Sequence, residues 1–505
     1  MLITKELPLT ATLVDRLIET LNRAEIVYSH WKSNIDLAQA TAGELDLDLL
    51  VDRRCLPQAL VILSSLGFKA AVARRGPNPP SIHHYYGFDP ESQHLIHVHL
   101  FSRVLTGESY VKSHLLPFEA MLLENVYYVN HMRVAAKPAE LVLFTLRMFI
   151  KYGSLFDLPV MRRKAKSLRT EVLWLQDKHE LSEALALLRK YCPVIDEPLF
   201  VKCVETLESN QPLFSRILLA WKVRRRLKVY AKQSSFKRLL AYGQVFSAEV
   251  RRRLGTKQKN KVLQAGGAMI AFVGADATGK STLVTETGRW LGGVFALTVI
   301  HTGKPPSSWL TLPVNTGLAL FRRLTVLQRS KRLPDQPTFD DSSPTQHKFK
   351  GPASLLYALR AVVLAWDRQR LILKARRRVA EGEIIICDRY PSRLIGAMDS
   401  PRLEEAPLKT GSAARLYNRL ARLEKQLYRQ IPPPDIVLKL RVSLATAKKR
   451  NRARNGQDGE AYLEARHQQS QTWHLPGTRY VYDIDTEQPL PETRLGVKKA
   501  IWESL

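Results

Sequence analysis

The residues from 268 to 291 constrain the fold more than any other part of this chain. An apolar run, AMIAFV, is followed by GADATGKST and then by a segment with helical spacing that ends near Leu291. The spacing GxxxxGK[ST] between a strand and a helix is typical of a loop that wraps a phosphate group. The sequence therefore predicts a strand, a phosphate-binding loop and a helix in direct succession.

The residue types in this loop suit the chemistry of a bound nucleotide. Gly274 and Gly279 let the backbone come close, so that its N–H groups can point at phosphate oxygens. Lys280 offers a positive charge to the β and γ phosphates, and Ser281 offers a hydroxyl to Mg²⁺. The helix N-terminus adds a favourable dipole. We expect these four residues, together with Thr282, to bind ATP.

A second segment carries the carboxylate that such a loop needs. Residues 383–388 read EIIICD, an apolar run that ends in Asp388. This is the Walker-B form, in which a buried strand delivers a carboxylate beside the phosphate loop. We expect Ser281 and Asp388 to hold Mg²⁺, Asp388 partly through water. The alternative interpretation is an ordinary core strand followed by a surface aspartate.

The pair GADATGKST and ICDRY resembles thymidylate kinase. In that family the arginine of the DR(Y) motif clamps the phosphate of the nucleoside monophosphate, and Arg389 fills this position. The segment AWDRQRLI resembles the helix whose arginine reaches the thymine base, which here is Arg368. Asp276 matches the acid that the family uses on the sugar 3′-hydroxyl. The resemblance covers about residues 266–505 and implies an ATP-dependent kinase.

Segments further along the chain extend this resemblance. PDIVLKL at 434–440 is like a core strand of the family, and YVYDID at 480–485 is like its closing strand. Between them, an arginine-rich stretch resembles the lid that excludes water and brings arginine to the transferring phosphoryl group. Ala277 stands where some members carry a loop arginine, so the lid is the expected source, although a solvated helix face would look similar. The resemblance thus implies catalytic roles for Lys280, Asp388, Arg389, Arg450, Arg452 and Arg454.

One segment departs from the family. The stretch from His301 to Pro352 is long, polar and rich in proline, and it has no counterpart in an ordinary thymidylate kinase. It falls where the phosphoryl acceptor is shaped. The acceptor therefore stays open between a nucleoside monophosphate such as dTMP and a related phosphorylated molecule.

The N-terminal region carries a pair of carboxylates. WKSN at 31–34, followed by Asp46-Leu-Asp48, resembles the nucleotidyltransferase signature. Alternation on a strand would place Asp46 and Asp48 on one face, about 7 Å apart, where they could form a second Mg²⁺ site. Two features differ from the signature: Lys32 replaces a glycine, and a later strand offers His97 and His99 instead of a third carboxylate. The alternatives are a domain of this type without catalysis, an exposed acidic strand face, or a transition-metal pair of histidines.

The pattern of strand-like and helix-like segments along the sequence predicts an α/β protein of several domains. We expect a nucleotidyltransferase-like α/β domain at 1–135, a helical domain at 136–215, a basic helical linker at 216–265 and a thymidylate kinase-like domain at 266–505. The last should be a parallel sheet with flanking helices, of the P-loop NTPase type. The layout resembles large bacterial proteins associated with surface-polysaccharide biosynthesis.

The charge of the chain predicts anionic partners. The formal net charge is +30 over 505 residues, and residues 216–265 alone hold 15 Lys and Arg against one acid, Glu249. This linker could contact nucleic acid or an anionic membrane, although a solvated helix face is the simpler interpretation. The four cysteines show no CxxC spacing, which argues against a zinc module or a disulfide framework. Without a signal-peptide core or a long apolar stretch, the expected location is cytoplasmic.

Three functional hypotheses follow. The favoured one is an ATP- and Mg²⁺-dependent phosphotransferase acting on a phosphorylated small molecule, with a homodimer as one compatible state. The second is a nucleotidyltransferase whose kinase-like part is regulatory. The third is a non-catalytic, nucleotide-gated binding protein in surface-polysaccharide biosynthesis.

Overall fold

The computed structural model describes residues 12–74, 78–107, 112–152, 158–176, 178–209, 213–232, 261–303, 354–393, 399–405, 411–453, 460–471 and 475–505. The chain divides into two compact units, Met1–Lys257 and Gln258–Leu505. Much of the predicted basic linker, most of the proline-rich segment and Arg454 lie outside the described residues. The finer division into four domains stays a prediction.

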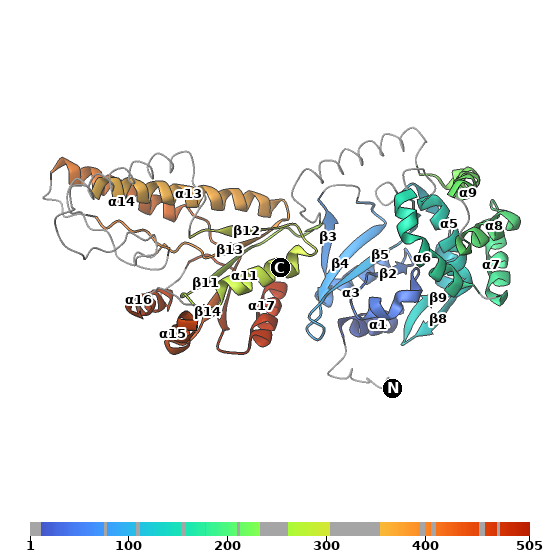
Figure 1. The fold of residues 1–505 in the computed structure, drawn as a ribbon, viewed down its shortest axis with the longest axis horizontal. Helices are drawn as coiled ribbons and strands as arrows, with labels where there is room; N and C mark the ends of the chain where they lie inside the picture. Colours follow the sequence, from blue (N-terminus) through green and yellow to red (C-terminus); the bar gives the residue numbers. More distant parts are fainter. Residues whose placement is uncertain are drawn as a thin grey trace. The chain divides into compact units, whose positions relative to one another are not determined.

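The first unit contains a mixed sheet with helices, which agrees with the α/β class predicted for this region (Figure 1). Within this unit neighbouring strands follow the order β3 (Lys69–Ala73), β4 (Ile82–Phe88), β5 (Leu95–Phe101), β2 (Leu47–Val51), β1 (Tyr28–His30), β9 (Met132–Ala135) and β8 (Val126–Val129). β2 runs parallel to β5 and β1 parallel to β9, whereas the other pairs are antiparallel. Short elements connect them: η1 (Asn34–Asp36), α2 (Leu37–Thr41), α4 (Glu119–Glu124), and a small hairpin of β6 (Val104–Thr106) and β7 (His114–Leu116).

Helices bury both faces of this sheet. The apolar spacing of α1 (Leu13–Arg23) and α3 (Leu56–Ser65) places one side of each helix in a core with Leu49, Val98 and Val134. A second core joins Trp31 and Phe101 to a helical layer. That layer consists of α5 (Lys137–Lys151), α6 (Leu158–Leu175), α7 (Lys178–Tyr191), α8 (Glu197–Glu208) and α9 (Leu213–Arg226), followed by η3 (Leu227–Tyr230). The predicted helical middle is therefore present.

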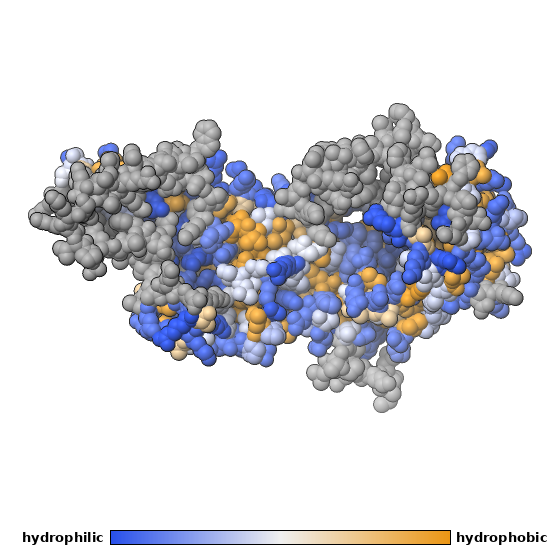
Figure 2. Space-filling view, viewed as in Figure 1, coloured by the Kyte–Doolittle hydropathy of each residue, from blue (hydrophilic) through white to orange (hydrophobic). Residues whose placement is uncertain are grey.

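The second unit is built on an all-parallel sheet, as predicted. Its strands follow the order β12 (Leu297–His301), β13 (Ile384–Asp388), β11 (Met269–Gly274), β14 (Ile436–Arg441) and β15 (Tyr480–Asp485). Every residue of β11 is buried, which explains why its sequence is continuously apolar rather than alternating. β12 forms one edge of this sheet; its Val299 is 46% exposed, and hydrophobic residues gather near this edge in Figure 2.

Helices cover both faces of the parallel sheet (Figure 1). α13 (Ser354–Ala380) and α14 (Ser412–Arg429) share a core with Met269, Ala271 and Val273 of β11. α11 (Lys280–Gly292) and α17 (Leu490–Ser504) lie on the other face, and α15 (Leu444–Ala453) and α16 (Glu460–Gln471) lie between β14 and β15 in sequence. A short strand, β10 (Lys261–Leu263), begins the described part of this unit. No helix among the described residues is both long and apolar enough to span a bilayer.

Candidate functional site

The phosphate loop follows the central strand of the parallel sheet and leads directly into α11. Gly274 ends β11 with φ +151°, and a Cβ there would lie 2.6 Å from the carbonyl oxygen of Leu440, so only glycine fits. Gly279 caps α11 with φ +87°. Ala277 also takes a left-handed conformation, with φ 62°, which is strained for a residue with a side chain. The loop is thus tightly wound, and its helix N-terminus is positioned to bind an anion.

Lys280 lies inside this loop. Its Nζ donates a hydrogen bond to the carbonyl oxygen of Gly274 at 3.0 Å and another to that of Ala275. Burial lowers the pKa of Lys280 to about 8, while the nearby Asp276 partly offsets this effect. Ser281 and Thr282, at the start of α11, are exposed. A bound phosphate would therefore meet exposed hydroxyls and an ammonium group held by its own loop.

Asp388 reaches the same edge of the sheet. It ends β13, in register with Phe272 of β11 and with His301 of β12, and the carboxyl ends of parallel strands meet at one edge. Its Oδ2 lies 3.2 Å from Nδ1 of His301, and this hydrogen bond lowers the pKa of Asp388 although burial opposes it. The same contact raises the pKa of His301. The carboxylate of Asp388 and the hydroxyl of Ser281 are hard oxygen donors, which suit Mg²⁺.

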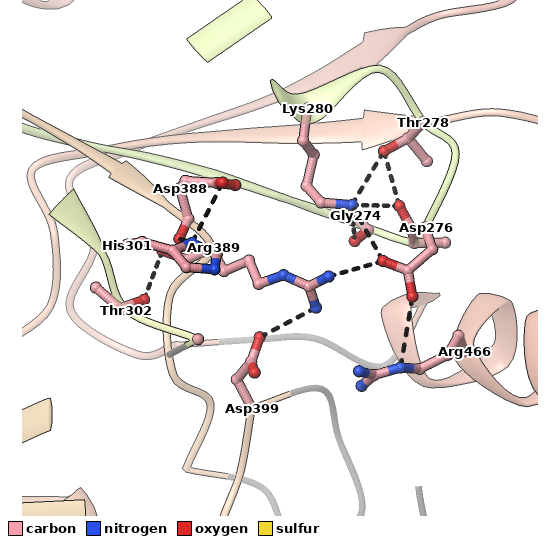
Figure 3. A network of polar contacts seen from close by, with 12 residues as sticks. Gly274, Asp276, Thr278, Lys280, His301, Thr302, Asp388, Arg389, Asp399 and Arg466 are labelled. Atoms are coloured by element: carbon pink, nitrogen blue, oxygen red, sulfur yellow. Dashed lines mark hydrogen bonds and ion pairs between the residues drawn. The ribbon is translucent and has the colours of Figure 1, made fainter. Parts of the chain in front are cut away.

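A chain of charged groups surrounds Asp276 (Figure 3). Its Oδ1 accepts a hydrogen bond from Nη2 of Arg389 at 2.8 Å, and its Oδ2 lies 3.6 Å from Nε of Arg466. Burial alone would raise the pKa of Asp276, but Lys280, Arg389 and Arg466 together lower it. Asp276 therefore stays ionised and holds three cations at the mouth of the loop.

Arg389 is fixed from several directions. Besides Asp276, its Nη1 lies 3.7 Å from Oδ2 of Asp399, and its backbone carbonyl accepts a hydrogen bond from Thr302 at 2.9 Å. Its backbone φ is 71°, again a left-handed conformation that is unusual for a residue with a side chain. Asp276 and Asp399, from two separate segments, thus set the direction of this guanidinium, and Thr302 holds the backbone of the same residue. Asp399 and Thr302 belong to no motif in the sequence, so sequence reasoning missed both.

Arg368, predicted to reach the acceptor, is buried in α13 and is only 3% exposed. Its Nε donates to the carbonyl oxygen of Thr302 at 3.0 Å, its Nη2 donates to that of Gly303 at 2.7 Å, and its Nη1 donates to the hydroxyl of Tyr428. Asp399 lies 3.9 Å away. In the structure, Arg368 therefore ties the end of β12 to α14.

The predicted lid arginines lie elsewhere. Arg450 donates to the carbonyl oxygen of Thr486 at 2.6 Å, and Arg452, with a side chain 74% exposed, pairs with Glu460. The structure brings neither into the network of Asp276. Arg466 of α16 occupies that place instead, with only 8% exposure. It lies within the same arginine-rich stretch of sequence, but no local pattern distinguishes it from the other arginines of that stretch.

The carboxylates of Asp46 and Asp48 are paired with basic side chains of the first unit. Nζ of Lys32 lies 2.8 Å from Oδ1 of Asp48, and Nδ1 of His99 lies 3.1 Å from the same oxygen. Asp46, which directly precedes β2, pairs with His97 at 2.7 Å. These contacts bring each of the two aspartates against one of the two histidines. The described residues contain no cluster of three or more acidic, histidine or cysteine side chains suited to a metal ion.

Comparison with known proteins identifies no family for this chain. No protein-family model matches the chain, and no curated protein matches it significantly. Among solved structures, the chain is similar to deoxyadenosine kinase from M. mycoides with bound dATP, at 15% identity. The similarity covers 46% of this chain and 98% of that chain, with a TM-score of 0.27. A likeness of this level bears on neither the substrate nor the mechanism of this protein.

Proposed function

We propose that residues 266–505 form an ATP- and Mg²⁺-dependent phosphotransferase whose acceptor is a nucleoside monophosphate or a related phosphorylated molecule. The observation that carries this proposal is the convergence of charges at one sheet edge. Lys280 and Asp276 come from the loop after β11, and Asp388 and Arg389 come from the end of the adjacent strand β13. A nucleotide needs cations and backbone donors for its phosphates, and an acceptor phosphate needs a cation of its own.

The residues divide into two groups by the phosphate that each would meet. The loop backbone and Lys280 face the nucleotide, and the N-terminus of α11 adds its dipole. Arg389, held by Asp276 and Asp399, offers a planar pair of donors suited to an acceptor phosphate. Arg466 reaches the same carboxylate from α16 and adds positive charge where the transferring group would lie.

The donor set also suits the metal ion. Ser281 and Asp388 would hold Mg²⁺, which neutralises charge on the nucleotide phosphates when it is bound. His301 keeps Asp388 ionised, because its hydrogen bond favours the carboxylate. Asp276 does not need to serve as a ligand, since Arg389 and Arg466 already use both of its oxygens.

The test is an assay of ADP release with a panel of nucleoside monophosphates, sugars and sugar phosphates. Lys280→Ala should abolish turnover, whereas Lys374→Ala, an exposed lysine of α13, should leave it unchanged. Arg389→Met should raise KM for the acceptor at least tenfold and change KM for ATP little. Unchanged turnover in Lys280→Ala would refute the proposal.

A further inference from the structure

One side of helix α9 is fixed in the core of the first unit. Its buried positions recur at helical spacing and continue into η3, and they belong to the core of the helical layer: Leu219, Ala220, Val223 and Leu227. Nη2 of Arg216 donates to the carbonyl oxygen of Thr206 at 2.9 Å, and Nη2 of Arg224 donates to that of Ile150 at 2.6 Å. Because these contacts hold the helix in one orientation, the same residues always face the solvent.

The opposite side of α9 exposes large apolar side chains. Leu218 is 47% exposed and Trp221 is 55% exposed, and a spacing of three residues places them on one helix face. Just beyond the helix, Val229 of η3 is 72% exposed. Single exposed apolar residues are common on proteins, whereas a group of them within one element is typical of an interaction surface.

Cations lie beside these apolar residues. Lys222, Arg225 and Lys228 are exposed, and the guanidinium of Arg225 lies 5.3 Å from the ring centroid of Trp221. Arg226 is also exposed and pairs with Asp196 at 3.1 Å. Residues 213–232 contain seven Lys and Arg and no Asp or Glu. We call the following residues the α9 face: Leu218, Trp221, Lys222, Arg225, Lys228 and Val229.

The charge of the α9 face restricts what can cover it. A second copy of this face would bring like charges together. The segment that follows in the chain, residues 233–260, holds seven Lys and Arg against one acid, Glu249, so it has the same sign of charge. The complementary surface is therefore negatively charged.

The mixture of residue types distinguishes between two kinds of negatively charged surface. The backbone of a nucleic acid is bound by cations and hydrogen-bond donors, and it offers nothing to exposed leucine and valine side chains. At the surface of a bilayer, Trp and Leu enter the boundary between headgroups and acyl chains, while Lys and Arg extend toward the headgroups. The α9 face combines both kinds of side chain, which favours a bilayer.

We propose that the α9 face binds the surface of a membrane that contains anionic lipids. Leu218 and Trp221 enter the boundary between headgroups and acyl chains. Lys222, Arg225 and Lys228 lie against the lipid phosphates. The contact is peripheral and reversible, because binding strength follows the buried apolar area and few apolar side chains take part. It involves the first unit and does not depend on the phosphotransferase proposed for the second.

The experiment is co-sedimentation of the full-length chain with vesicles of phosphatidylcholine and phosphatidylglycerol in equal parts and, in a second arm, with vesicles of phosphatidylcholine alone. We expect binding to the first kind only, and this binding should weaken as salt rises. Trp221→Gln should weaken it about tenfold, the effect of burying on the order of 60 Å² of apolar surface. Lys222→Gln combined with Arg225→Gln should weaken it on the order of 25-fold, at about fivefold for each cation.

Two control variants match these changes elsewhere in the chain. Arg479 is exposed and lies 5.1 Å from the ring centroid of Tyr480, so Arg479→Gln removes a cation from an aromatic ring as Arg225→Gln does. Val61 of α3 is 67% exposed, so Val61→Gln removes an exposed apolar side chain as Trp221→Gln does. Both controls should bind the anionic vesicles like the parent. Because all the substituted positions are exposed, we expect every variant to fold.

A third arm offers double-stranded DNA and RNA in place of vesicles. No binding of the parent to anionic vesicles, equal binding to both kinds of vesicle, or unchanged vesicle binding by Trp221→Gln would overturn the proposal. Nucleic acid that displaces the parent from vesicles, and that is bound more weakly by Lys222→Gln with Arg225→Gln but not by Trp221→Gln, would assign the face to nucleic acid instead. None of these outcomes depends on phosphotransferase activity.

Discussion

The buried carboxylate of Glu140 should make the stability of the first unit depend on pH. Glu140 is only 1% exposed, and burial raises its pKa from 4.5 to about 7, against the hydrogen bonds from Asn34 that favour the ionised form. A pKa that is higher in the folded protein means that the folded state binds the proton more tightly. The resulting stability is fully present below pH 4.5 and is lost as the pH rises through 7.

The magnitude follows from the two pKa values. A rise from 4.5 to about 7 corresponds to about 3 kcal/mol, at 1.36 kcal/mol for each pH unit. Glu140→Gln keeps the shape of the side chain and cannot ionise. Relative to the wild type, this variant should therefore become more stable by about 3 kcal/mol between pH 5 and pH 8.

Comparing Glu140→Gln with the wild type cancels the contributions that other titrating groups make to the free energy of unfolding. Burial lowers the pKa of His99 to about 4, so His99 changes the stability in the opposite direction over part of the same range, but it does so in both proteins. The assay is hydrogen exchange of the α5 amides in increasing urea, which reports the opening of this unit alone. Glu91→Gln, at an exposed position, serves as the control and should show a constant difference. A pH-independent difference for Glu140→Gln, or one of opposite sign, would refute the reasoning.

Three further predictions concern the second unit. ATP affinity should fall as the pH rises through about 8, where Lys280 of the free protein loses its proton. Asp276→Asn should move this fall to lower pH, because Asp276 raises the pKa of Lys280. Measurement of the Kd for ATP from pH 6 to 9 checks both expectations. Arg466→Met should reduce kcat on the order of 10²-fold, while Arg450→Ala and Arg452→Ala should change kcat little. Steady-state kinetics measures this difference, and equal kcat values for the three variants would contradict the prediction. Tyr428→Phe should lower the unfolding free energy of this unit by about 1–3 kcal/mol, because it removes a buried acceptor of Arg368; urea unfolding measures the loss.

The strands and loops with a strong local pattern could be predicted from the sequence. The loop spacing and the apolar run before it identify β11 and α11, and EIIICD identifies β13 together with the carboxylate at its end. The resemblance of residues 480–485 to a closing strand matches β15 to the residue. These features are local, because the loop and its flanking strand and helix are adjacent in the chain.

The contacts between distant residues could not be predicted in the same way. Arg466 meets Asp276 across 190 residues, and which arginine of its stretch turns inward depends on where α16 begins. The position of Arg368 matches a motif, but its partners Thr302, Gly303 and Tyr428 are set by packing. Lys32 likewise stands out from the sequence only as a replaced glycine; its pairing with Asp48 requires β1 and β2 to be neighbours.

Two residues beside the carboxylates of the candidate site, Asp276 and Asp388, have backbones that a glycine would adopt more easily. Ala277 follows Asp276 with φ 62°, and Arg389 follows Asp388 with φ 71°. Each such conformation costs roughly 1–2 kcal/mol. Ala277→Gly should consequently raise the Tm of the second unit, because relief of this conformation outweighs the added freedom of the unfolded chain. Selection for thermal stability and selection for a rigid site would thus oppose each other at these two positions. Relatives that tolerate heat should differ first at residue 277 and not at residue 389, whose side chain is proposed to bind the acceptor phosphate.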